Sequence, residues 1–399
     1  MDGLFFFKRS ETRDIETIAA LRLARSHGIG PMLWRKLVSR FGSTQAALEA
    51  WPDLPWDRGR KAPTLCSARQ AEAELERLDR LGAKLLVLGS ADYPAAMAEI
   101  ADPPPVLAVR GNVAALGQAP VAIVGARNAS SNGRRLAENF AQALAGAGRV
   151  VVSGLARGID TAAHYGALAA SHDGTVTGAL TVAVLAGGLD KPYPPENLDL
   201  LEHIVERGAA ISEVALGTAP TARHFPRRNR IIAGLAQGVV VIEAALKSGS
   251  LITARLANEQ GREVMAVPGS PLDARCRGCN ALLRDGATLI ETADDIISAL
   301  PVVIPPAAPR PVVSQRLAMV PAVEPAAKPV RAAAVIGAAV PVGNGHEAIA
   351  GLLAASPTAI DELVRRSALP AATVSAILLD LELAGRLERH AGNAVSLTH

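Results

Sequence analysis

Short apolar runs alternate with helical patterns through residues 76–300. The runs, mostly of β-branched or aliphatic residues, lie at 84–88, 121–124, 149–152, 181–185, 209–211, 239–242, 264–267 and 287–290. Between them the apolar residues follow a helical period, as in 134–145, where Leu136, Phe140 and Leu144 are four residues apart. Each interval is long enough for a crossover connection. The pattern therefore predicts βαβ units of the α/β class: an extended Rossmann-like, doubly wound parallel sheet with helices on both faces.

The N-terminal residues carry a purely helical pattern. Residues 15–26 and 31–41 predict two helices joined by the tight turn Gly28-Ile29-Gly30, within an all-α domain of residues 1–75. This is the outline of a helix-hairpin-helix or sterile-alpha-motif-like domain, in which the amides of the turn can face a phosphate. A plain helical hairpin explains the same pattern, so both interpretations stay open.

A compositional boundary separates a small C-terminal domain. Nine prolines and eleven alanines between residues 301 and 345 predict a linker. In residues 346–399, helices at 359–366 and 371–384 and a hairpin at 386–397 predict a winged helix. The domain has four basic and six acidic residues, and the start of its second helix has no Arg, Lys, Asn or Gln to reach base edges. We therefore expect it to contact protein rather than to read DNA.

Composition narrows the class of protein. The chain has 399 residues, of which 49% are hydrophobic and 20% charged, and a net charge of +3, as in soluble globular proteins. Its three cysteines are too few for a disulfide framework. The first residues lack the positive charge of a secretory signal, and no uncharged stretch reaches the roughly 18 to 20 apolar residues of a membrane span. We expect a cytoplasmic protein with no membrane contact.

Glycine- and serine-rich loops follow several of the predicted strands. In an open α/β sheet, ligands bind beyond the carboxyl ends of the strands, where loop amides and helix N-termini meet. Glycine lets the backbone approach an anion, and serine caps helices and donates hydrogen bonds. The candidate residues are Gly125 and Arg127, then Ser153, Gly154 and Arg157, then Lys247, Ser248, Gly249 and Ser250. Together these loops predict a phosphate-binding surface on one edge of the sheet.

One short segment concentrates positive charge beside an aromatic ring. Arg223, Phe225, Arg227, Arg228, Asn229 and Arg230 lie within eight residues. Guanidinium groups suit phosphate oxygens, and an exposed aromatic ring suits the face of a base, so the segment fits a single-stranded nucleic acid. The alternative is a solvated helix start with Phe225 in the core.

The common nucleotide and metal motifs are missing from the sequence. No Gly-x-Gly-x-x-Gly follows a strand and no P-loop motif occurs, which argues against an NAD(P)-dependent oxidoreductase and a P-loop ATPase. Cys276 and Cys279 form a C-x-x-C pair, but a structural zinc site needs four ligands and there is no second pair. We predict no metal and no cofactor.

Three polar residues near the loops have simpler explanations than catalysis. Asp160 and Asp190 stand beside glycines, where aspartate is ordinary turn or capping chemistry. His164 lies on an alanine-rich helix that Thr161 is placed to cap, and a packed or capping histidine is the expected role. We therefore predict no catalytic residue.

Six motifs resemble the DNA-processing protein DprA (Smf) family over residues 90–300. They are Gly125-Ala-Arg127, Ser153-Gly-Leu-Ala-Arg-Gly-Ile-Asp160, Phe225-Pro-Arg-Arg-Asn-Arg-Ile-Ile-Ala-Gly234, Glu243-Ala-Ala-Leu-Lys-Ser-Gly-Ser-Leu-Ile-Thr-Ala254, Val267-Pro-Gly269 and Gly278-Cys-Asn280. The resemblance implies a Rossmann-like domain that binds single-stranded DNA, forms a homodimer and loads the RecA recombinase onto incoming DNA during natural transformation. It also implies sterile-alpha-motif-like and winged-helix flanking domains.

The resemblance further implies roles for individual residues. Gly125 and Arg127 would contact phosphates, the segment from Arg223 to Arg230 would line the pocket, and the loop 247–250 would contribute beside them. Ala126 departs from the family pattern, because many members have Ser or Thr there, and the departure removes one hydroxyl donor.

A nucleoside-monophosphate phosphoribohydrolase on a similar fold is the alternative function. Enzymes of that type use a Pro-Gly-Gly-x-Gly-Thr-x-x-Glu loop. The comparable stretch here, Lys247-Ser-Gly-Ser-Leu-Ile-Thr-Ala254, lacks the acid at the required place. The sequence therefore favours a DNA binder that is not an enzyme.

Overall fold

The computed structural model describes residues 15–54, 64–170, 178–301, 342–353, 357–390 and 393–397. Most of the predicted linker and the tip of the predicted wing, 391–392, lie outside these ranges. Contacts divide the chain into two units, residues 1–52 with 63–303 and residues 53–62 with 304–399. No helix in the described ranges is both long and apolar enough to cross a bilayer.

The N-terminal helices confirm the predicted hairpin. The elements are α1 (Ile15–Arg25), α2 (Pro31–Phe41), α3 (Thr44–Glu49), the 3-10 turn η1 (Trp51–Asp53) and α4 (Ala68–Arg80). Gly28, with φ at +84°, makes the turn after α1, and Pro31 occupies the first turn of α2, where its missing N–H costs nothing. Trp34 and Leu37 are buried on the inner side of α2.

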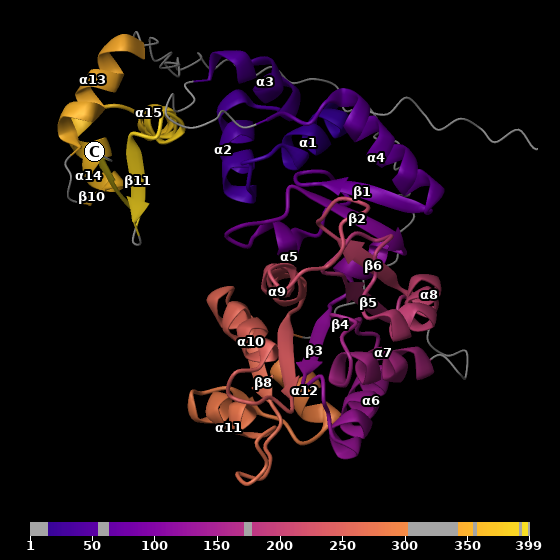
Figure 1. Ribbon diagram of the computed structural model, residues 1–399. Coiled ribbons are helices and arrows are strands. Elements are labelled where there is room, and N and C mark those ends of the chain that lie inside the picture. Colours follow the sequence, from indigo (N-terminus) through magenta and orange to yellow (C-terminus); the bar gives the residue numbers. More distant parts are fainter. Residues whose placement is uncertain are drawn as a thin grey trace, which may run out of the picture. The chain divides into compact units, whose positions relative to one another are not determined.

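Nine strands in the described residues form one sheet (Figure 1). They are β1 (Ala83–Val87), β2 (Val106–Gly111), β3 (Val121–Gly125), β4 (Val151–Ser153), β5 (Thr181–Val184), β6 (Ala209–Ser212), β7 (Gly238–Ile242), β8 (Glu263–Ala266) and β9 (Thr288–Leu289), in the order β1-β2-β6-β5-β4-β3-β7-β8-β9. All eight predicted strands are present. The seven neighbouring strands β6-β5-β4-β3-β7-β8-β9 are parallel to one another, as predicted.

One edge of the sheet differs from the prediction. β2 is absent from the predicted strands, and it pairs antiparallel with both β1 and β6. The prediction of a wholly parallel sheet is therefore wrong at this edge. The connection from β1 to β2 contains the four-residue helix α5 (Ala95–Ala98).

Helices cover both faces of the sheet, as predicted. They are α6 (Ser131–Gly146), α7 (Ile159–Ala169), α8 (Leu198–Arg207), α9 (His224–Leu235), α10 (Gly249–Glu259), α11 (Arg277–Arg284) and α12 (Ala293–Ala299), with 3-10 turns η2 (Val113–Gly117) and η3 (Pro195–Asn197). Alternate residues of β3 pack on opposite faces: Val121 and Ile123 belong to the core with α6, α7 and α12, whereas Ala122 and Val124 belong to the core with α9 and α10. Figure 1 shows these two helix groups on either side of the strands.

The strand order creates one place where neighbouring connections diverge. From β3 the chain proceeds outward through β4 and β5 to β6, and then returns through α9 to β7 on the other side of β3. The loops after β3 and β7 consequently leave in different directions. A doubly wound sheet binds its ligands in the crevice that opens at such a position.

The C-terminal unit is a winged helix. It contains α13 (Val342–Leu352), β10 (Thr358–Ala359), α14 (Ile360–Ser367), α15 (Ala371–Leu383), β11 (Leu387–His390) and β12 (Ala394–Leu397). Its three strands form an antiparallel sheet in the order β10-β12-β11, over a core that includes Ile349, Leu363 and Val374. α13 begins inside the segment that composition assigns to the linker.

Candidate nucleic-acid interface

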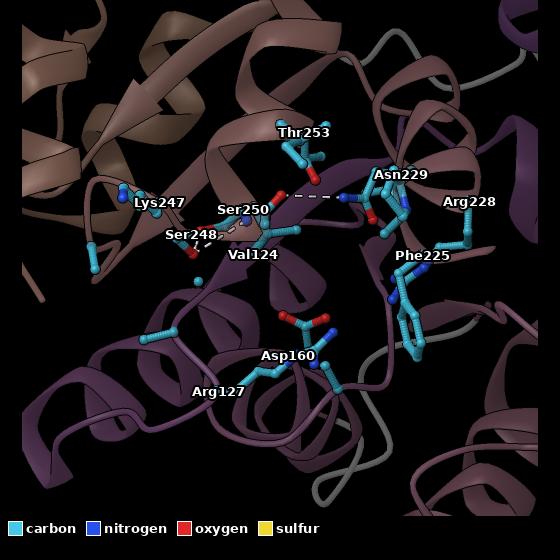
Figure 2. A pocket seen from close by; sticks show the side chains of 18 of the residues that line it. Val124, Arg127, Asp160, Phe225, Arg228, Asn229, Lys247, Ser248, Ser250 and Thr253 are labelled. Atoms are coloured by element: carbon cyan, nitrogen blue, oxygen red, sulfur yellow. Dashed lines mark hydrogen bonds between the residues drawn. The ribbon is translucent and has the colours of Figure 1, made fainter. Parts of the chain in front are cut away.

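A cavity of about 540 Å³ lies at the divergence between β3 and β7. Its walls come from the loop after β3, the loop after β7 and the first turns of α9 and α10. Figure 2 shows side chains from these separate segments converging on it. The predicted edge of the sheet therefore carries an open concave site and not merely a series of turns.

The loop after β3 packs tightly and ends in an exposed cation. A Cβ on Gly125 would lie 1.9 Å from the carbonyl oxygen of Ile242, so only glycine fits there. Arg127 is exposed, and its guanidinium carbon lies 5.0 Å from the centre of the Phe225 ring, within the range of a cation–π contact. Phe225 is half-buried at the rim of the cavity. The alternative that places this ring in the core is therefore wrong.

The loop after β7 supplies a helix N-terminus and a second exposed cation. The Ser248 hydroxyl accepts a hydrogen bond from the Ser250 amide at 3.3 Å and so caps α10. Lys247 is exposed, and Figure 2 shows it across the cavity from Phe225. The N-terminus of α10 adds partial positive charge to this wall. The loop therefore presents an anion-binding surface to the cavity.

Glu243, the acid that follows β7, binds Ser130 and does not line the cavity. The Glu243 carboxylate accepts hydrogen bonds from the Ser130 amide at 2.8 Å and from the Ser130 hydroxyl. Ser130 in turn caps α6. Glu243 has φ at +52°, an uncommon conformation for a residue with a side chain. Its carboxylate fastens α6 to the end of β7 and is absent from the cavity lining.

A buried cation and a buried acid form the floor of the cavity. Arg228 is 5% exposed, and its guanidinium fills the space where Gly154 would carry a Cβ. Burial lowers the pKa of Arg228 to about 10, so the side chain keeps its charge at neutral pH. Its Nε has no hydrogen-bond partner in the described part of the chain. Asp160 accepts a hydrogen bond from the Gly154 amide at 3.1 Å, and burial raises its pKa.

His164 lies behind this floor and is fully buried, as expected for a packed residue. Its Nδ1 is 2.7 Å from the Thr181 hydroxyl, which donates its own hydrogen to the Val151 carbonyl. Nδ1 must therefore carry the ring hydrogen. Burial, followed by the neighbouring charge of Arg228, lowers the pKa of His164 to about 3, so the ring is neutral.

The structure brings nine of the candidate residues together at the cavity. They are Gly125, Arg127, Phe225, Arg228, Asn229, Lys247, Ser248, Gly249 and Ser250. Asn229 links two of the segments, because its side-chain amide donates to the Gly249 carbonyl at 3.2 Å.

The other six candidates lie outside the lining. Ser153 is buried and donates to the Ile123 carbonyl at 2.6 Å, and Gly154 lies behind Arg228. Arg157 is exposed and paired with Glu196. Arg223 is exposed at the N-cap of α9. Arg227 and Arg230 complete the six.

Arg227 and Arg230 face a different part of the molecule. Arg230 is buried and pairs with the buried carboxylate of Glu213. Arg227 is half-exposed, and its Nε lies 2.8 Å from the same carboxylate. From α1, Arg25 donates to the Glu213 carbonyl at 2.9 Å. These contacts join α9 to the N-terminal helices.

Two predictions about individual residues need correction or addition. Thr161 does not cap α7: the N-cap is Gly158, with φ at +79°, and the Thr161 hydroxyl donates to the Ala156 carbonyl at 2.7 Å. Thr253 and Arg275 line the cavity but are not among the candidates. Thr253 falls within the sequence motif after β7, and that position was the available signal for it.

Asp190 acts in loop structure, as predicted. Its carboxylate accepts from the Gly217 amide at 2.7 Å and pairs with Arg77 at 2.8 Å. In the described ranges no three His, Cys, Asp or Glu side chains group as metal ligands would.

Three family models match the chain. DNA recombination-mediator protein A matches residues 84–301, which is more than half of the sequence. The chain belongs to the DNA recombination-mediator protein A family. A DprA-like N-terminal HHH domain matches residues 14–76, and a DprA winged helix domain matches residues 337–393. The resemblance drawn from the six motifs is confirmed.

Individual relatives agree with this assignment. DNA processing protein DprA of Streptococcus pneumoniae is 44% identical over 206 residues, covering 52% of this chain and 70% of the relative. Protein Smf of Synechocystis is 38% identical over 284 residues, covering 68% of this chain and 70% of the relative. The X-ray structure of the Streptococcus pneumoniae protein superposes with a TM-score of 0.60 at 32% identity, over 72% of this chain and 98% of that one.

The function that follows is DNA processing as a recombination mediator. The predicted fold class, with a helical N-terminal domain and a winged helix flanking the Rossmann-like sheet, is confirmed by the same comparisons. The phosphoribohydrolase alternative is not favoured.

Proposed function

We propose that the cavity between β3 and β7 binds single-stranded DNA through its phosphates and one base, without breaking a bond. The observation that carries the proposal is the arrangement of side chains at the rim of the cavity. Arg127 lies over the Phe225 ring on one side and Lys247 lies across the cavity. Cations beside an accessible aromatic ring match the alternation of phosphate and base along an unpaired strand.

Charge at the floor supports an anionic ligand. The Arg228 Nε lacks a partner in the described residues, and an unsatisfied buried N–H costs on the order of 1–3 kcal/mol. Arg228 also lines the cavity, so its positive charge favours an anionic group there. The N-terminus of α10, capped by Ser248, adds amides that suit the same ligand.

The acids near the cavity support a role without catalysis. Among the described lining residues Asp160 is the one carboxylate, and it is buried and bonded to the Gly154 amide. Glu243 is occupied in capping α6 through Ser130. Hydrolysis of a glycosidic bond ordinarily uses a pair of carboxylates on either side of the bond. The lining supplies no such pair.

The bound strand would then pass to the RecA recombinase, and the protein would act as a homodimer through its Rossmann-like domain. Support for the dimer comes from a second cavity, where Leu246 and Pro271 lie beside Leu283 of α11. Leu246 is 53% exposed and the neighbouring Leu272 is 96% exposed. We propose that a second copy of the chain covers these leucines, since exposed apolar patches mark interaction sites.

Binding of labelled oligonucleotides tests the proposal. Fluorescence anisotropy with the full chain should show tighter binding to a single strand than to the matching duplex. Arg127→Ala should weaken binding, while Arg69→Ala, a change to an exposed arginine on α4, should not. Equal affinity for single strand and duplex would remove the proposal.

Two further assays test its remaining parts. Light scattering should give twice the chain mass, and Leu272→Glu should reduce it to one chain. With single-stranded DNA, the protein should shorten the lag before RecA filaments form. Incubation with AMP or with DNA should release no free base or nucleotide. Release of base would instead establish an enzyme.

A further inference from the structure

A second aromatic ring stands beside Phe225, outside the cavity. Tyr193 lies in the loop between β5 and η3, and it is 43% exposed. Its ring centre is 6.0 Å from that of Phe225, with the two planes at 74°. In this edge-to-face arrangement each contact uses at most one face of a ring. At least one face of Tyr193 is therefore left open by Phe225.

The loop that carries Tyr193 is firmly held. After it, the Asn197 side-chain amide donates to the Leu155 carbonyl at 2.9 Å and to the Thr161 hydroxyl at 2.8 Å. Before it, Asp190 accepts from the Gly217 amide. These bonds fix both ends of the loop to neighbouring segments. The exposed ring is thus presented in a set position, which lowers the entropy cost of a contact made there.

Two cationic side chains lie near Tyr193 in space or in sequence. Arg157 lies near Tyr193, and its side chain is 56% exposed beside Glu196. Lys191 is exposed two residues before Tyr193. The alternation of cation and aromatic ring that marks the cavity rim therefore continues past Phe225 on the side of β5.

We infer that Tyr193 stacks a base of the bound strand next to the one at Phe225, so that the DNA leaves the cavity across these two rings towards the loop after β5. The inference rests on the proposed function and extends it by one nucleotide and a direction. It assigns Tyr193 a contact with a base and no contact with a phosphate.

The chain provides a matched control for this residue. Tyr165 on α7 is also exposed, at 51%, and it lines another cavity with residues of α6 and α8. It makes no ring contact with Phe225 among the described aromatic pairs. Tyr165→Ala removes the same side chain from a helix away from the proposed strand.

Affinity for a fluorescent oligothymidylate, measured with the full chain, tests the inference. Tyr193→Ala should weaken binding roughly 5- to 150-fold, the range expected for one stacked base. Tyr193→Phe and Tyr165→Ala should bind as the unaltered protein does. The salt dependence of binding should be the same in all of them, because no phosphate contact is lost. An unchanged affinity in Tyr193→Ala, or a loss that Tyr193→Phe does not rescue, would overturn the stacking role.

Abasic substitutions identify the base. An oligonucleotide with one abasic position, moved stepwise along the strand, should lose affinity for the unaltered protein at two neighbouring positions. At one of them Tyr193→Ala should cause no further loss, because ring and base are then missing together. If the losses add at every position, Tyr193 does not stack. If the unaltered protein does not prefer single strands at all, the proposed function fails first, and the two failures are distinct.

Discussion

The arginines on the two sides of helix α9 differ in whether their guanidinium groups have carboxylate partners. On the cavity side, Arg228 is buried with an unpartnered Nε in the described part of the chain. On the other side, Arg230 and Arg227 share the carboxylate of Glu213. All three arginines belong to one short motif. The difference lies in what opposes each charge, and it separates residues available to a ligand from residues that stabilise the fold.

The Glu213 side also explains how the N-terminal helices join the sheet. Arg25 donates three hydrogen bonds to the Glu74 carboxylate, and it donates to the Glu213 carbonyl as well. A buried ion pair offsets its desolvation only when its geometry is good and its remaining hydrogen-bonding groups are satisfied. Here a single carboxylate meets two arginines and its backbone meets a third. We expect this side of α9 to affect unfolding more than binding.

The largest expected effect comes from Arg230→Ala. Arg230→Ala leaves the buried carboxylate of Glu213 with only the half-exposed Arg227 beside it among the described residues, and removing one partner of a buried ion pair costs about 3–5 kcal/mol. Urea denaturation should show this loss in the free energy of unfolding. Arg227→Ala, at a half-exposed position, should cost at most about 1 kcal/mol. Equal losses in the two variants would contradict the assignment of Arg230 to the interior.

The next effect is the pH dependence of stability that comes from the buried His164. The pKa of His164 falls from 6.5 to about 3 on folding, so below pH 6.5 the unfolded chain binds a proton that the folded chain does not. Stability from this residue is complete above pH 7 and is lost as pH falls, by about 3 kcal/mol between pH 6.5 and pH 4. Unfolding of His164→Asn should lack this part of the pH dependence. A parallel dependence in both proteins would mean that the ring is hydrated.

The smallest effect is expected on the cavity rim. Lys247→Ala should leave the free energy of unfolding within about 0.5 kcal/mol of its original value, because the side chain is exposed. Its affinity for single-stranded DNA should fall, since a phosphate contact is lost. Denaturation and anisotropy on one preparation measure both quantities. A destabilised protein with unaltered affinity would reverse the comparison between the two sides of the helix.

The sequence predicted the parallel part of the fold because each strand there is a continuous apolar run. It missed β2, whose run follows Pro103, Pro104 and Pro105, a stretch that reads as a loop. It also placed the cap of α7 on Thr161, although the left-handed turn at Gly158 starts the helix. Caps of this type depend on backbone conformation, which side-chain propensities do not reveal.

The position of the candidate site could be predicted from the sequence, but only some of its residues and contacts could. Loops after neighbouring parallel strands must meet at one edge, so Arg127 and Lys247 could be placed together from the sequence. The partner of Arg230 could not, because Glu213 comes from the end of another strand and no local pattern joins them. Tyr193 escaped notice for the same reason, since its contact with Phe225 spans two separate connections.

The salt dependence of binding to single-stranded DNA tests the central claim most directly. The logarithm of the binding constant should fall linearly with the logarithm of salt concentration, and the slope should lose about 0.7 for each phosphate contact removed. We predict that Arg127→Ala combined with Lys247→Ala reduces the slope by about 1.4, and that Arg227→Ala leaves it unchanged. A slope that stays the same in the double variant would contradict a DNA site between β3 and β7.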